Sequence, residues 1–77
     1  MNPLVDITET QEHGTVLVCR DLELADQFED FITEQCYVLF TVKMNSSQVL
    51  FHFGQASSPA KVQELFDRFT ARLESAR

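Results

Sequence analysis

Two short stretches near the start of the chain carry the hydrophobic pattern of β-strands. Residues 5–8 alternate between apolar and polar side chains, and residues 15–19 form a run rich in β-branched residues. Residues 11–14 lie between them and have the composition of a turn, with a glycine, Gly14, that adopts positive φ at little cost. The pattern therefore predicts a β-hairpin.

A helix is predicted to follow this hairpin, over about residues 22–35. Asp21 stands where a helix N-cap is wanted, because its side chain can accept a hydrogen bond from the first turn. Apolar residues then recur at helical spacing and define one face: Leu24, Phe28, Phe31 and Ile32. The rest of the helix carries five carboxylates: Glu23, Asp26, Glu29, Asp30 and Glu34.

The second half of the chain repeats this arrangement. Strands are predicted over residues 37–43 and 48–53, joined by a turn at Asn45-Ser46-Ser47. Ser58 and Pro59 then form a strong helix start, with serine as N-cap and proline in the first helical position. The helix that follows has one apolar face, made by Val62, Leu65, Phe66, Phe69 and Leu73.

The predicted order is ββαββα, a single α+β domain over residues 1–77. We expect a four-stranded sheet with both helices packed on one face and the other face open. Residues 16–18 recur in kind at 49–51, and 28–31 recur at 66–69, at offsets of 33 and 38 residues. Two explanations stay open: any two hairpin–helix units look alike, or the fold has a pseudo-two-fold axis.

Alternation along the strands separates two faces of the predicted sheet. The almost wholly apolar set is expected beneath the helices: Val5, Ile7, Val16, Val18, Val38, Phe40, Val42, Val49, Phe51 and Phe53. The opposite face is expected to expose a candidate interaction surface: Leu17, Cys19, Tyr37, Leu39, Leu50 and His52. Such a patch favours self-association, a different partner or a small ligand. Alternatively, these are ordinary exposed residues, or the terminal segments cover them.

Charge narrows the choice of partner. The net charge is −6, but residues 1–36 carry −8 and residues 37–77 carry +2. Without a basic footprint, binding to nucleic acid or to an anionic membrane is disfavoured. The acidic side of the first helix is either a solvated surface or a docking site for a basic protein.

The chain offers little recognisable chemistry, so no cofactor, metal or enzymatic activity is expected. Cys19 and His52 are the only thiol–base pair predicted to share a face, which makes a small thiol enzyme the least favoured function. The two cysteines and two histidines lack zinc-site spacing, and the two glycines are too far apart for a phosphate loop.

Location is predicted from what the sequence lacks. Residues 1–6 do not resemble a signal peptide, and the apolar stretch over residues 36–42 is too short to span a bilayer. We therefore expect a soluble cytoplasmic protein with reduced cysteines. The favoured function is a non-enzymatic interaction module, a homodimer through the open sheet face. The alternative is an acidic adaptor or inhibitor that binds a basic protein through the first helix.

Overall fold

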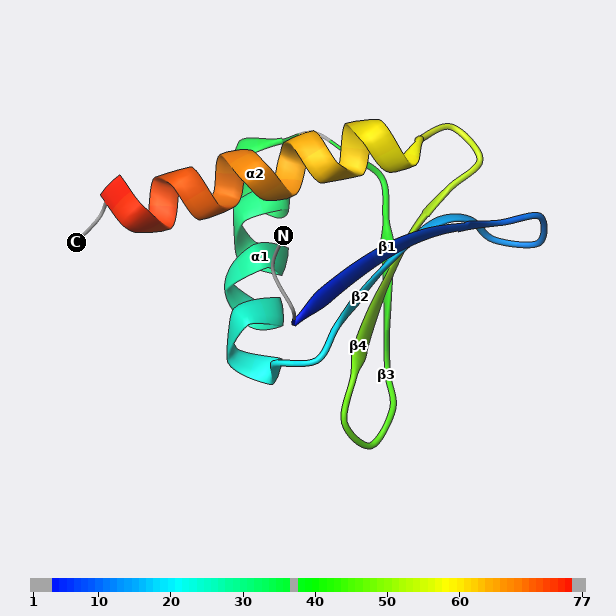
Figure 1. Ribbon diagram of the computed structural model, residues 1–77, viewed down its shortest axis with the longest axis horizontal. Coiled ribbons are helices and arrows are strands. Elements are labelled where there is room, and N and C mark those ends of the chain that lie inside the picture. Colours follow the sequence, from blue (N-terminus) through cyan, green and yellow to red (C-terminus); the bar gives the residue numbers. More distant parts are fainter. Residues whose placement is uncertain (1–3, 37, 76–77) are drawn as a thin grey trace.

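The computed structural model describes residues 4–36 and 38–75, and its elements follow the order ββαββα (Figure 1). In chain order they are β1 (Val5–Thr10), β2 (Gly14–Cys19), α1 (Leu22–Gln35), β3 (Thr41–Met44), β4 (Val49–Gly54) and α2 (Pro59–Ser75). The predicted α+β class and element order are confirmed.

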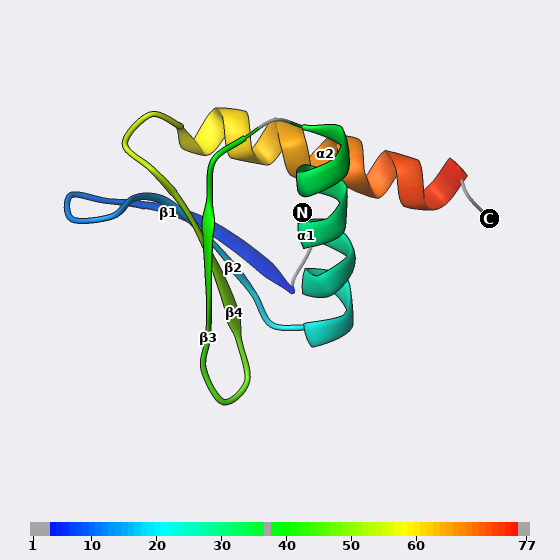
Figure 2. The same ribbon diagram turned by 180° about the vertical axis from the view of Figure 1, so that it is seen from behind.

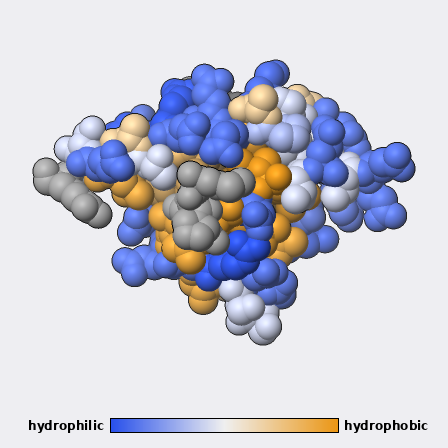
Figure 3. All heavy atoms as spheres, viewed as in Figure 1, coloured by the Kyte–Doolittle hydropathy of each residue, from blue (hydrophilic) through white to orange (hydrophobic). Residues whose placement is uncertain are grey.

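Both helices begin where the sequence predicts. The Asp21 side chain accepts a hydrogen bond from the Leu24 backbone N–H at 3.0 Å, and the Ser58 hydroxyl accepts one from the Lys61 N–H at 3.2 Å. These bonds satisfy N–H groups that have no partner within the helix, so each cap fixes the first turn. Figure 3 shows hydrophilic residues along the outer side of α2 and at the tip of the β1–β2 hairpin.

The sheet has the strand order β1-β2-β4-β3, and every neighbouring pair is antiparallel. Both helices lie on the same side of it, as Figures 1 and 2 show from opposite directions. Phe28 of α1 and Phe66 of α2 share one buried cluster with Phe51 of β4. A single core therefore joins both helices to one face of the sheet, and no helix among the described residues covers the opposite face.

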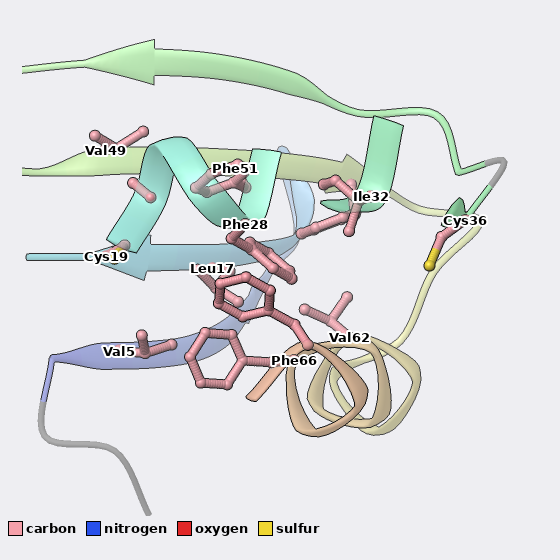
Figure 4. Close-up of a cluster of buried hydrophobic side chains, with 13 residues drawn as sticks. Val5, Leu17, Cys19, Phe28, Ile32, Cys36, Val49, Phe51, Val62 and Phe66 are labelled. Atoms are coloured by element: carbon pink, nitrogen blue, oxygen red, sulfur yellow. The ribbon is translucent and has the colours of Figure 1, made fainter. Parts of the chain in front are cut away.

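The predicted facing of β2 is wrong. Leu17 and Cys19 are buried in the core between the sheet and the helices (Figure 4). Val16 and Val18 point to the opposite side of the sheet, where Val16 is 5% exposed and Val18 is partly exposed. Residues opposite each other in an antiparallel pair point to the same side of the sheet. Because Leu17 pairs with Ile7 and with Phe51, the register fixes its direction toward the core.

The second hairpin faces the way the alternation predicts, although β3 is shorter than expected. Phe51 and Phe53 are buried, and Val42 packs partly buried beside them. The β3–β4 ladder begins only at the Thr41–His52 pair, so residues 38–40 are not part of the strand. Tyr37, predicted to begin this strand, lies outside the described residues.

The topology fits two hairpin–helix units related by a pseudo-two-fold axis between β2 and β4. Such an axis, perpendicular to the sheet, maps each residue of β2 onto a residue of β4 that points to the same face. In the observed register Leu17 is opposite Phe51, and Val18 is opposite Leu50. Two residues that the axis makes equivalent must therefore lie an even number of positions apart in the sequence. The offset of 33 residues between the two strand sequences is odd, so it does not describe this symmetry. An axis at the Leu17–Phe51 pair relates residues that are 34 positions apart.

Candidate interaction surface on the open sheet face

Two rows of side chains cross the open face of the sheet from β1 to β3. The register aligns one residue from each strand in each row. The first row is Asp6, Val18, Leu50 and Lys43, and the second row is Thr8, Val16, His52 and Thr41. We call these eight residues the open face. It has an apolar centre on the two middle strands and polar residues on both edges.

The first row carries opposite charges at its two ends. Asp6 on β1 forms an ion pair with Arg20, which follows β2. Val18 and Leu50 form a directly opposed cross-strand pair, and both side chains are partly exposed. At the far end, Lys43 on β3 is exposed. The row therefore runs from a carboxylate through two aliphatic side chains to an ammonium group.

The structure brings together only part of the surface that the alternation predicts. Leu50 and His52 lie on the open face, and Leu39 beside it is 91% exposed. Leu17 and Cys19 belong to the core instead. The residues that the prediction missed are Val16 and Val18, and the signal that identifies them is their pairing with Thr8 and Asp6.

A shallow depression adjoins the second row, where the β1–β2 turn folds toward β4. Its volume is about 480 Å³ and it is widely open to solvent. His13 from the turn packs edge-on against His52, with ring centroids 5.2 Å apart. His52 Nε2 is buried without a hydrogen-bond partner among the described residues. Burial, His13 and Lys43 together lower the pKa of His52 below its ordinary value.

We expect acidification to weaken the fold through His52. Because its pKa is lowered from 6.5 in the folded state, the unfolded chain binds more protons once the pH falls below about 6.5. The melting temperature should therefore fall between pH 7 and pH 5.5, and His52→Gln should flatten that decline. The measurement is thermal melting by circular dichroism at each pH.

His13→Gln provides the matched control for this pH dependence. It removes one charged neighbour but leaves the burial, which is the largest cause of the lowered pKa. The His13 variant should therefore keep most of the decline. A His52→Gln profile as steep as that of the wild type would contradict the role given to this side chain.

The structure separates the two residues of the predicted thiol–base pair. Cys19 lies on the core side of β2 opposite Val49, whereas His52 lies on the open face. Burial raises the pKa of the Cys19 thiol, and its Sγ lies 3.3 Å from the Asp21 carbonyl oxygen. A protonated, buried thiol is a poor nucleophile. Cys36 is also buried in the core.

A second, separate surface lies between the two helices. The groove there has a volume of about 300 Å³ and an apolar floor made by Phe31, Phe69 and Leu73. Asp30 and Glu34 of α1 line it from the acidic side of that helix. The groove therefore combines apolar contact area with two carboxylates from α1 and one guanidinium group, that of Arg72, from α2.

The described residues form neither a metal-ion cluster nor a membrane-spanning helix. Over residues 4–36 and 38–75, no three His, Cys, Asp or Glu side chains are grouped to hold a metal ion. Neither described helix is long and apolar enough to cross a membrane. Comparisons with protein-family models, curated proteins and solved structures returned no match to this chain.

Proposed function

We propose that the protein is a small, non-enzymatic interaction module that self-associates through the open face of its sheet. The observation that carries this proposal is the Val18–Leu50 pair, two aliphatic side chains on the central strands with both helices packed on the opposite side. A solvent-facing antiparallel sheet normally has polar residues at such positions. Apolar residues there favour a surface that another protein covers.

The shape of this surface favours a macromolecular partner over a small ligand. Ligand sites are usually concave and bury most of the molecule that they bind. The depression beside His52 is widely open, and the two rows of the open face lie on a continuous sheet. Such a surface suits another protein surface of similar extent.

We expect Leu50→Lys to convert the dimer into a monomer. The substitution places a charge at the apolar centre of both copies, where docking would remove it from water. Because two lysines would be buried in each dimer, the dissociation constant should rise on the order of 100-fold. Size-exclusion chromatography with light scattering, over a concentration series, measures this change.

Leu22→Lys is the matched control, because Leu22 is a 49% exposed leucine on α1, away from the open face. It should leave the dissociation constant unchanged, and both variants should melt close to the wild type. A wild-type protein that stays monomeric at millimolar concentration would rule out self-association. A Leu50→Lys protein that dimerises like the wild type would place the interface elsewhere.

A second candidate function is that of an acidic adaptor or inhibitor that binds a basic protein through α1. The groove between the helices favours it, because Asp30 and Glu34 stand beside an apolar floor. Docking through these charges would weaken steeply with salt, whereas pairing through Val18 and Leu50 would resist it. The same light-scattering series at low and high salt therefore separates the two functions.

A further inference from the structure

We propose that two copies pair with their two-fold axis parallel to the strands, so that β1 of each protomer lies over β3 of its partner. This inference rests on the proposed function, since it specifies how the open face meets a second open face. It follows from the order of side chains along the two rows.

The first row is complementary to itself when its order is reversed. A two-fold axis that lies between two facing sheets and runs along the strands exchanges the left and right ends of each row. Asp6 then faces the partner's Lys43, and Val18 faces the partner's Leu50. One rotation thus creates two contacts between opposite charges and two aliphatic contacts.

The same rotation also brings compatible side chains together in the second row. Thr8 then faces the partner's Thr41, so hydroxyl groups meet at both edges. Val16 stands opposite the partner's His52, but at 5% exposure it adds little contact area, so the imidazole ring of His52 supplies the apolar body next to the aliphatic centre. No charged group meets a like charge in either row. The strands of the two sheets remain nearly aligned, which is the commonest geometry for sheets packed face to face.

An axis perpendicular to the strands gives a poorer match. It places β1 over β1 and β3 over β3, so the carboxylate edge meets a carboxylate edge and the Lys43 edge meets its own copy. Like charges in this arrangement oppose docking. The charges of the first row therefore select the axis along the strands.

The Asp6–Arg20 ion pair is compatible with this contact. Arg20 bonds to Oδ2 of Asp6. A carboxylate accepts several hydrogen bonds through two oxygens, so Oδ1 can receive the ammonium group of the partner's Lys43. Asp6 would then bridge two cations at the rim of the interface.

The size of the sheet sets the expected affinity. Three of the strands are six residues long and β3 is four residues long, so at about 3.3 Å per residue and about 4.8 Å between strands the sheet covers roughly 350 Å². Two such faces bury on the order of 700 Å² in total, which is the size of a weak, transient interface. We therefore expect a weak, reversible dimer whose formation is sensitive to single substitutions.

Reversing one charge of the first row tests the axis. Lys43→Glu turns both contacts with Asp6 from attractive to repulsive, so dimerisation should weaken about tenfold. Asp6→Lys, Arg20→Glu and Lys43→Glu together exchange the charges of this contact and keep an ion pair between positions 6 and 20, so dimerisation should return to within a few-fold of the wild type. Lys61→Glu, on the exposed surface of α2, is the control and should have no effect. Analytical ultracentrifugation gives the dissociation constants, and melting curves verify that each variant is folded.

The outcomes separate this inference from the proposed function. If the wild type dimerises and Leu50→Lys dissociates it, but Lys43→Glu has no effect, the open face is the interface and the proposed axis is wrong. If the triple variant dimerises no better than Lys43→Glu alone, the Asp6–Lys43 contact is also wrong. A monomeric wild type overturns both proposals.

Discussion

Replacing Phe28 with alanine should remove a large fraction of the free energy of unfolding. Phe28 is 1% exposed, and its ring lies 5.2 Å from Phe51, 5.4 Å from Phe66 and 5.2 Å from Phe69. Removing a fully buried phenylalanine costs about 3–5 kcal/mol, because contacts are lost and a cavity remains. A domain of this length has a total stability of about 4–11 kcal/mol.

Urea denaturation followed by circular dichroism measures this loss. Phe31→Ala is the matched control, because Phe31 is only partly buried and touches the aromatic cluster through Phe69, at 5.6 Å. We expect it to lose less than half as much stability. Equal losses at the two positions would mean that Phe28 is not the centre of the core.

The second large effect is expected at Gly14, the first residue of β2. Its φ is 70°, and a Cβ atom there would lie 2.2 Å from the Gly54 carbonyl carbon. The added atom would meet backbone that cannot move aside without breaking the β2–β4 ladder. Gly14→Ala should therefore cost about 3 kcal/mol or more, from the positive φ and the collision together.

Gly54→Ala is the control that separates the two causes. Gly54 has a φ of 81°, yet nothing lies within 4 Å of the position where its Cβ would be. The variant should lose only the cost of a positive φ, about 1–2 kcal/mol. Denaturation curves of both variants test the comparison, and equal losses would show that the collision at Gly14 is relieved by a small shift of the chain.

Local signals in the sequence predicted the elements well. Asp21 and the Ser58-Pro59 pair mark both helix starts, because a cap depends on chemistry within one turn. Alternation predicted the facing of β4, where Val49, Phe51 and Phe53 are separated by Leu50 and His52. In the helix caps and in β4, the residues that determine the structure lie within a few positions of one another, so the sequence alone is enough to predict it.

The facing of β2 could not be obtained from its own residues. All four residues from Val16 to Cys19 are apolar, so the sequence does not show which alternate pair of them points to the core. The length of the preceding turn decides instead. A four-residue turn over 11–14 would pair Ile7 with Val18, but the loop has three residues and Thr10 pairs with Gly14. A shift of one residue reverses every side chain of a strand, which removed Leu17 and Cys19 from the predicted surface.

The strand order has a consequence for how the chain folds. Among the described strands, the β2–β4 ladder is the only pairing between the two hairpin–helix units. Each hairpin forms by closing a turn of a few residues within its own unit. The β2–β4 ladder, in contrast, must bring Cys19 next to Val49. Closing such a long segment costs more entropy than forming either turn. The two hairpins should therefore form early, and the formation of the β2–β4 ladder should set the folding rate.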